Sequence, residues 1–283
     1  MSKPGGFMCP FCRQYNARDA RHCGRCERLL PPSWLAGPLR NLGTVDLWAT
    51  KLLAGTSILV FALEMASAGG ASLNVLTSLP ASVLFRFGAL ANGLPTSEPW
   101  RLLAACFVHM GVLHVAMNLL ALAELGRVGE PLVKGSRFLI TYVVTGIAGF
   151  LVSALWYGTR PYLTAGASGA IFGLDGLILG GLLARRDPAW KSMLSRTLVH
   201  SFLFYFALGG ATNQAAHLGG LAAGLGLGFL FGQEKRPWRR DAAAHMLAAA
   251  GLVAIIGSLV LSQVSPVWRS VRAAETRRTG GGE

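Results

Sequence analysis

The chain has 283 residues, of which 52% are hydrophobic and 14% are charged. Soluble domains carry roughly a quarter of charged residues, so this composition excludes an ordinary soluble domain and predicts an all-α polytopic membrane protein. The formal net charge of +13 is dispersed over several polar segments. Dispersed basic residues are typical of membrane orientation, and we therefore predict no binding to nucleic acid.

A short cysteine-rich segment precedes the first apolar stretch. Two C-x2-C pairs, separated by ten residues, comprise Cys9, Cys12, Cys23 and Cys26. This spacing predicts a small zinc ribbon in residues 1–30, in which four thiolates bind a structural zinc. Disulfide pairing is the alternative. Because the segment is too short for a sizeable core, metal should supply most of its folding energy. Residues 31–46 are predicted to be a linker, and the cytosolic partner of the module is unknown.

Seven apolar stretches approach the ~20 residues that a transmembrane helix needs. They lie at residues 47–68, 102–123, 138–157, 167–184, 197–212, 214–232 and 242–263. Lysine and arginine are concentrated before the first stretch and after the second, fourth and sixth, which predicts that these segments are cytoplasmic. With seven spans the tail would lie on the outer, non-cytoplasmic side, although it carries Arg269, Arg272, Arg277 and Arg278, which is contrary to the usual distribution of basic residues.

Three motifs with polar side chains occur within these apolar stretches, where such groups are costly unless they have a function. Their residues are His109, His114 and Asn118; Gly166, Ser168 and Gly169; and His217, Gly220 and Gly224. The second, fourth and sixth helices must run in the same direction, so the motifs are predicted to meet at one depth near the outer surface. His114 and Asn118 share a helix face, whereas His109 points away and is predicted to be structural.

Glycine spacing indicates which helices pack together. Glycines four residues apart occur at 169 and 173, at 176 and 180, and at 220, 224, 228 and 232. Such small-residue faces let helix backbones approach closely. Packing the fourth helix on the sixth would place Ser168 beside His217, as a nucleophile beside its general base.

The chemistry of a serine hydrolase follows from this pairing. No carboxylate is placed to orient His217, so we predict a dyad whose imidazole packs against Phe172. The oxyanion would be stabilised by the backbone N–H of Ser168 and by the side chains of His114 and Asn118. A metal hydrolase is less favoured because no acidic ligand accompanies the histidines.

Together these motifs, with the Trp100-Arg101 pair upstream, resemble the rhomboid family of intramembrane serine proteases. The resemblance implies a six-helix core over residues 47–232, followed by a cytoplasmic loop and an extra transmembrane helix over 233–263 and a polar tail over 264–283. It implies that Ser168 and His217 are catalytic and that Trp100 and Arg101 belong to the first outer loop. Glu130 resembles the family's structural glutamate. The fifth span would correspond to the helix that gates lateral access of substrates.

By the same resemblance, the protein would cleave transmembrane segments of other membrane proteins near the outer membrane face, with no cofactor for catalysis. It would lie in the lipid bilayer of a bacterial inner membrane with a cytoplasmic N-terminus. A catalytically silent relative that binds transmembrane helices is the alternative. A transporter is less favoured because the sequence shows neither inverted repeats nor broken helices.

Two acidic residues inside the apolar stretches need an explanation of their own. Asp175 lies on the same helix face as Ser168 and is either a functional group or a hydrogen-bonded packing residue. Glu64, in the first span, is predicted to be structural.

Overall fold

The computed structural model describes residues 7–8, 14–17, 20–27, 47–68, 78–91, 97–158, 160, 162–207, 212–233 and 241–279. The chain divides into two units, Met1–Leu47 and Trp48–Glu283. In the first unit, β1 (Phe7–Met8) pairs with β2 (Tyr15–Asn16) in an antiparallel hairpin. The Asn16 side chain accepts a hydrogen bond from the backbone N–H of Gly24 over 3.0 Å, which ties the hairpin to the turn that contains Cys23 and Cys26.

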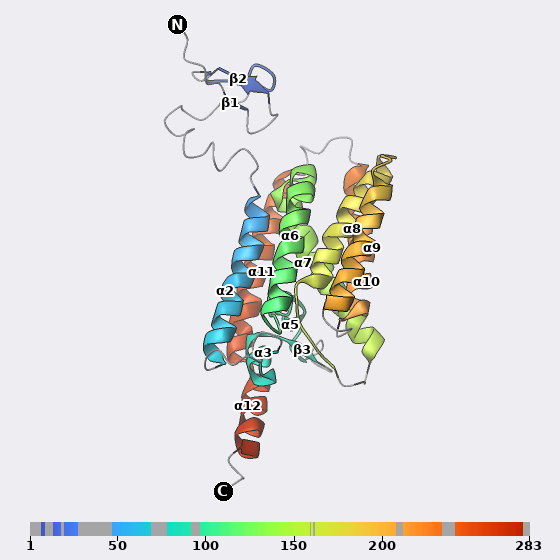
Figure 1. Cartoon of the computed structure of the whole chain (residues 1–283). Coiled ribbons are helices and arrows are strands. Elements are labelled where there is room, and N and C mark those ends of the chain that lie inside the picture. The colour runs from blue at the N-terminus through green and yellow to red at the C-terminus, as the bar shows by residue number, and fades with distance from the viewer. Residues whose placement is uncertain are drawn as a thin grey trace. The chain divides into compact units, whose positions relative to one another are not determined.

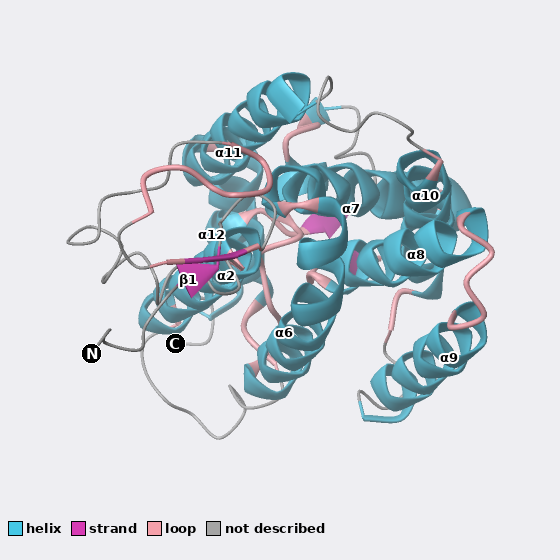
Figure 2. Cartoon of the chain, turned by 90° about the horizontal axis from the view of Figure 1, so that it is seen from above, coloured by secondary structure: helices cyan, strands magenta, loops and turns pink. Residues whose placement is uncertain are grey.

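The second unit is a bundle of long helices, shown in Figures 1 and 2. They are α2 (Trp48–Ser67), α6 (Val112–Val133), α7 (Gly135–Tyr157), α8 (Ser168–Ala184), α9 (Trp190–Ala207), α10 (Gln214–Gly232) and α11 (Asp241–Val264), with α12 (Pro266–Thr279) after them. Successive helices from α6 to α11 alternate in direction, so α6, α8 and α10 begin at the same end of the bundle (Figure 1). We call this end the serine end, because α8 begins with Ser168.

Five segments among the described residues are long and apolar enough to cross a membrane: Trp48–Ser67, Val112–Val133, Gly135–Tyr157, Gln214–Gly232 and Ala243–Ala274. The chain is therefore a multi-pass membrane protein. Helix α8 is apolar but shorter, with 17 residues. Its residues from Gly169 to Gly180 are all buried, so protein surrounds this helix along most of its length.

Two predicted spans begin at the wrong residue. The second transmembrane helix starts at Val112 rather than at residue 102. Residues 102–111 instead contain most of the short helix α5 (Arg101–Ala104) and a buried turn, in which Phe107 and Val108 have no exposed surface. These residues are apolar because they fill the protein interior, and hydropathy does not distinguish that from contact with lipid. Helix α9 starts seven residues earlier than predicted, at Trp190.

Glu130 connects the far end of α6 to the beginning of α2. One carboxylate oxygen accepts a hydrogen bond from the backbone N–H of Ala49 over 2.9 Å. The other accepts from the N–H of Thr50 over 2.9 Å and from its hydroxyl over 2.6 Å. The first N–H groups of a helix have no partner within the helix, and a carboxylate there also interacts favourably with the helix dipole. The predicted structural role of Glu130 agrees with these contacts.

Helices α8 and α10 lie side by side (Figure 2) and pack backbone against backbone. A Cβ atom built at Gly220, Gly224 or Gly228 of α10 would overlap a carbonyl oxygen of α8. In the opposite direction, a Cβ atom at Gly176 or Gly180 of α8 would overlap a carbonyl oxygen of α10. The glycine spacing thus correctly predicted that these two helices pack together, because only a missing side chain permits such an approach.

The connection between α2 and α6, described for residues 78–91 and 97–111, folds over the serine end. It contains α3 (Ala81–Phe87), α5 and β3 (Leu90–Ala91), and β3 pairs with β4 (Leu163–Thr164) just before α8. Gly166 donates a backbone hydrogen bond to the Ala105 carbonyl over 2.8 Å. This α2–α6 loop is therefore joined to the segment that leads into Ser168.

Candidate active site

Ser168 is the first residue of α8, and its loop is shaped by Gly166. Gly166 has φ = 130°, in a region that L side chains rarely adopt. A Cβ atom there would also lie 2.6 Å from Cε1 and 2.7 Å from Nε2 of His114. Only glycine satisfies both conditions, and its absence of a side chain lets the imidazole of His114 lie against the loop that precedes the serine.

His217 lies in the first turn of α10, and its Nε2 is 2.8 Å from Oγ of Ser168. Its ring stacks on Phe172, one turn along α8 from the serine, with 4.4 Å between ring centroids and 24° between the ring planes. This confirms the predicted packing of the imidazole against Phe172. The stacking fixes the plane of the ring, and the hydrogen bond then fixes which nitrogen faces the serine hydroxyl.

Asn213, which was not among the predicted site residues, positions the beginning of α10. Its Oδ1 accepts a hydrogen bond from the backbone N–H of Ala216 over 3.0 Å, which is an N-cap. Its Nδ2 donates to Oγ of Ser153 in α7 over 2.6 Å and to Oγ1 of Thr164 in β4 over 3.0 Å. An asparagine directly before an apolar helix is a cap signal that could have revealed the first contact.

His114 lies on the side of α6 that faces this loop, Asn118 follows it one turn later, and both are buried. Nδ1 of His114 accepts a hydrogen bond from the backbone N–H of Met110 over 3.4 Å. A neutral imidazole that accepts at Nδ1 carries its proton on Nε2, which is the nitrogen that lies against Gly166. Asn118 donates one amide hydrogen to the His114 carbonyl over 2.8 Å, so the second hydrogen of its amide remains as a donor.

The prediction that His109 points away from the other histidine was wrong. It assumed that α6 already includes residue 109, whereas the helix begins at Val112. The rings of His109 and His114 are 5.3 Å apart and meet edge to face. His109 also has contacts that suit a structural role, because its backbone N–H donates to the buried carboxyl group of Glu64 over 3.3 Å and its ring Nδ1 lies 3.0 Å from the Phe107 carbonyl.

Trp100 and Arg101 belong to the α2–α6 loop, and Arg101 supports it from within. Arg101 is completely buried and pairs with Glu98. Its guanidinium also donates to the carbonyls of Phe85 and Ala89 and, over 2.9 Å, to the hydroxyl of Ser265. These bonds hold α3, α5 and the end of α11 together, so the role of Arg101 is structural.

Asp175 is fully buried two turns beyond Ser168 and contacts α9. It accepts a hydrogen bond from the Thr197 hydroxyl over 3.3 Å and lies 3.4 Å from Nδ1 of His200. Nε2 of His200 lies 3.4 Å from Glu124 of α6, so His200 bridges two carboxylates on different helices. No sequence pattern indicated His200, because its two partners come from other helices. These contacts support the interpretation of Asp175 as a hydrogen-bonded packing residue.

The cysteine motif lies only partly within the described residues. Cys9 and Cys12 lie outside them. Cys23 is buried at the start of a tight turn that ends at Cys26. The backbone N–H of Arg25 points at Sγ of Cys23 over 3.4 Å, an arrangement that suits a thiolate acceptor. No group of three or more metal-binding side chains occurs among the described residues, and half of the predicted ligand set is not among them.

The sequence was compared with known proteins. It matches the Rhomboid domain over residues 96–234, which include all nine residues of the three motifs. It is 34% identical over 179 residues to Rhomboid protease GluP of Bacillus subtilis (strain 168), covering 62% of this chain and 33% of GluP. It is 32% identical over 190 residues to Rhomboid-like protease 1 of Toxoplasma gondii, covering 61% of this chain and 64% of that protein.

The chain spans about a third to a half of the length of GluP and of two RHOMBOID-like proteins of Arabidopsis thaliana. A shorter relative is covered more fully. YdcA of Bacillus subtilis (strain 168) is 34% identical over 148 residues, which make up 50% of this chain and 72% of YdcA. The match covers more than two thirds of YdcA, and the Rhomboid domain spans the helices that carry the serine and the histidines. The chain therefore belongs to the rhomboid family.

Proposed function

We propose that this protein is an intramembrane serine endopeptidase that uses Ser168 and His217 as a catalytic dyad. The observation that carries the proposal is the 2.8 Å distance between Nε2 of His217 and Oγ of Ser168 at the serine end of the bundle. A serine hydroxyl is a weak nucleophile unless an adjacent base accepts its proton. The names of the relatives GluP and Rhomboid-like protease 1 support the same activity.

The proposed reaction begins when Oγ of Ser168 attacks the scissile carbonyl carbon and its proton passes to Nε2 of His217. The peptide bond then breaks, and His217 returns the proton to the departing amine. Water hydrolyses the acyl-enzyme by the same route in reverse. His217 therefore acts first as a base and then as an acid, and its stacking on Phe172 keeps the ring in one place throughout.

We propose three donors to stabilise the oxyanion. The first-turn N–H of Ser168 has no acceptor within its own helix and lies at the positive end of the helix dipole. Nε2–H of His114 faces the serine loop, and Asn118 keeps one amide hydrogen. Removing one preorganised donor of this kind typically lowers the rate by on the order of 100-fold.

The substrates we propose are transmembrane segments of other membrane proteins, cut near the outer face. The distribution of basic residues supports this placement, because it puts the N-terminal segment in the cytoplasm and the serine end outside. In a bacterium, the corresponding membrane is the inner membrane. A transmembrane segment brings its scissile bond to the depth of the serine end without leaving the bilayer.

The test is cleavage of a model transmembrane substrate by the purified protein in liposomes. Ser168→Ala and His217→Ala should each lower the rate by on the order of 10³-fold or more. Ser192→Ala and His245→Ala, which alter exposed residues of the same types, should leave it unchanged. Labelling of Ser168 by a fluorophosphonate, detected by mass spectrometry, should depend on His217.

Two results would contradict the proposal. Wild-type protein that binds substrate helices without cutting them or reacting with the label would be a catalytically silent relative. Cleavage that persists in both variants would show that the active site lies elsewhere.

We also propose that Cys9, Cys12, Cys23 and Cys26 bind one structural zinc ion. The cysteine spacing and the N–H that points at Sγ of Cys23 support this. Metal analysis of the full-length protein should find one zinc per chain, lost in Cys9→Ser and kept in Cys106→Ala. Intact disulfides between these cysteines, found by mass spectrometry of non-reduced protein, would overturn the proposal.

A further inference from the structure

A polar pocket lies where the end of α2, the helix α3 and the helix α12 meet. Its volume is about 370 Å³. The residues that line it are Ser67, Ser82, Val83, Arg86, Trp268, Arg272 and Thr276. Two are arginines, three carry hydroxyl groups, and none is acidic. The pocket is therefore positively charged and rich in hydrogen-bond donors, and it is separate from the Ser168–His217 pair.

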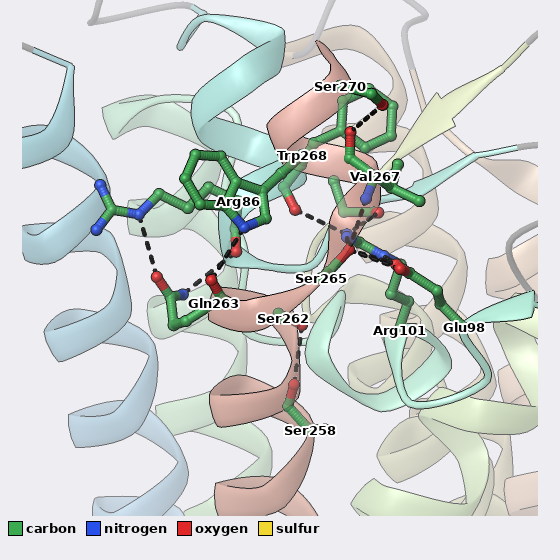
Figure 3. Close-up of polar contacts among 12 residues, drawn as sticks. Arg86, Glu98, Arg101, Ser258, Ser262, Gln263, Ser265, Val267, Trp268 and Ser270 are labelled. Atoms are coloured by element: carbon green, nitrogen blue, oxygen red, sulfur yellow. Dashed lines mark hydrogen bonds and ion pairs between the residues drawn. The ribbon is translucent and has the colours of Figure 1, made fainter. Parts of the chain in front are cut away.

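Arg86 is held in a fixed orientation in this pocket. Its Nε donates to Oε1 of Gln263 over 3.1 Å, and its Nη1 donates to Oγ of Ser67 over 3.3 Å. The ring centroids of Phe87 and Trp268 each lie 5.6 Å from Cζ of Arg86. Figure 3 shows the guanidinium of Arg86 beside Gln263 and the indole of Trp268. A guanidinium that is fixed in this way loses little conformational entropy when a ligand binds.

The positive charge of the pocket is not neutralised within the part of the chain that the structure describes. No described carboxylate forms an ion pair with Arg86 or with Arg272. Two guanidinium groups with hydroxyls around them match the geometry of a phosphate, which accepts several hydrogen bonds and carries negative charge. The chemistry of the pocket thus points to a phosphate group as its ligand.

The surroundings of the pocket indicate which kind of phosphate-bearing molecule would bind there. Ser67 is the last residue of α2, and Val264, the last residue of α11, lies only four residues before Trp268. Leu63 of α2 and Val260 of α11 are 48% and 58% exposed, so apolar surface that lipid tails can cover adjoins the ends of both helices. Tryptophan and arginine at this level are typical of the interface between lipid headgroups and water.

We propose that this pocket binds the phosphate of an anionic phospholipid headgroup, with the acyl chains on the apolar surfaces of the neighbouring helices. Arg86 and Arg272 would bind the phosphate oxygens, and Ser82 would donate a further hydrogen bond. An acidic peptide is less favoured, because the pocket adjoins membrane-spanning helices rather than an extended soluble surface. The proposal does not depend on proteolytic activity.

The test is native mass spectrometry of the full-length protein released from detergent that contains phosphatidylglycerol or phosphatidylcholine. Wild type should retain phosphatidylglycerol in preference to phosphatidylcholine. Arg272→Gln, whose side chain is exposed and makes no structural contact among the described residues, should weaken retention about fivefold or more. Arg86→Gln should do the same, but it also removes the bonds to Gln263 and Ser67. Arg269→Gln removes one charge from the same helix outside the pocket and should have little effect.

Competition experiments distinguish the remaining sources of phosphate and negative charge. Inorganic phosphate at millimolar concentration should not displace the lipid, because it lacks the acyl chains. Displacement by free phosphate or by an acidic peptide, with no preference between the two lipids, would overturn the lipid assignment. Equal losses in Arg272→Gln and Arg269→Gln would show general attraction to a basic helix and would overturn the site itself.

Discussion

Asn213 makes three hydrogen bonds through one short side chain, and His217 follows one turn later. Replacing it with alanine removes the N-cap of α10 and the links to Ser153 and Thr164. Loss of a cap alone costs about 0.5–2 kcal/mol. We expect Asn213→Ala to lower the free energy of unfolding by at least that much, and to lower cleavage because the start of α10 shifts.

Two variants separate the contributions of this residue. Asn213→Asp keeps the acceptor for the Ala216 N–H but loses both donors, so its stability should lie between those of wild type and Asn213→Ala. Gln214→Ala changes the adjacent exposed residue and is the control. Thermal unfolding in detergent micelles gives the comparison, and equal melting temperatures for Asn213→Ala and Gln214→Ala would contradict the assignment.

The sequence predicted the site residues that stand in short motifs. It did not indicate residues whose hydrogen-bond partners are distant in the chain. Ser168 and His217 stand in short motifs with recognisable neighbours. The contact of Asn213 with Ser153 and that of His200 with Asp175 join separate helices, and no periodicity in either helix indicates them. His109 was misplaced because the helix rule was applied to residues outside the helix.

The packing of α8 on α10 provides a matched pair of glycines for a test at the scale of elements. A Cβ atom at Gly224 would overlap the carbonyl of Gly173, whereas a Cβ atom at Gly226, on the same helix, would meet no atom within 4 Å. We expect Gly224→Ala to separate the helices, lower stability by about 1–3 kcal/mol and lower cleavage. Gly226→Ala should be neutral or slightly stabilising, because alanine favours the helix.

Unfolding in mixed micelles together with the cleavage rate would measure both glycine variants. Similar behaviour of the two variants would mean that backbone contact does not determine the spacing of these helices. A loss of cleavage in Gly224→Ala at unchanged stability would show that the spacing matters for catalysis in its own right.

Asp175 offers a second test at this scale, because it attaches α9 to α8. Asp175→Asn should weaken the contacts with Thr197 and His200 and lower stability by about 1 kcal/mol. Asp187→Asn alters an exposed carboxylate before α9 and serves as the control. Since Asp175 does not contact Ser168 or His217 in the described hydrogen bonds, the pH profile of cleavage by folded protein should stay the same. A changed profile with full stability would indicate a catalytic role.

The order of the helices was predictable, but the start of two of them was not. Hydropathy located α2, α7, α8, α10 and α11 within a few residues. It failed for α6, because Phe107 and Val108 are buried in protein, and for α9, because Lys191 and Arg196 make its first half polar. A sequence window records that a residue avoids water, and it does not record whether lipid or protein surrounds that residue.

At the scale of the whole molecule, the junction of α11 and α12 fastens the α2–α6 loop, as Figure 3 shows. The Ser265 hydroxyl contacts both carboxylate oxygens of Glu98 and accepts a hydrogen bond from Arg101. Ser265→Ala removes a hydrogen-bond partner from the buried Glu98–Arg101 ion pair and should lower the free energy of unfolding by about 1–3 kcal/mol. Ser270→Ala, on the exposed side of α12, should cost little.

Thermal unfolding and limited proteolysis of the two serine variants would check this. We expect faster cleavage of the α2–α6 loop by added protease in Ser265→Ala alone. Equal proteolysis of both variants would show that the loop is held by its other contacts. The sequence did not indicate this junction, because Glu98 and Ser265 are 167 positions apart and lie in segments with different patterns.

The interlocked backbones of α8 and α10 also restrict how the two helices can move. At Gly176, Gly180, Gly220, Gly224 and Gly228, a carbonyl of one helix fills the space left by the missing side chain of the other, so sliding along the common axis would drive these oxygens into the adjacent turns. We therefore expect Ser168 and His217 to keep their relative position when other helices shift. If the proposed activity is correct, any opening that admits a substrate must come from parts outside this pair, such as α9 or the α2–α6 loop, and such an opening would leave Ser168 and His217 aligned.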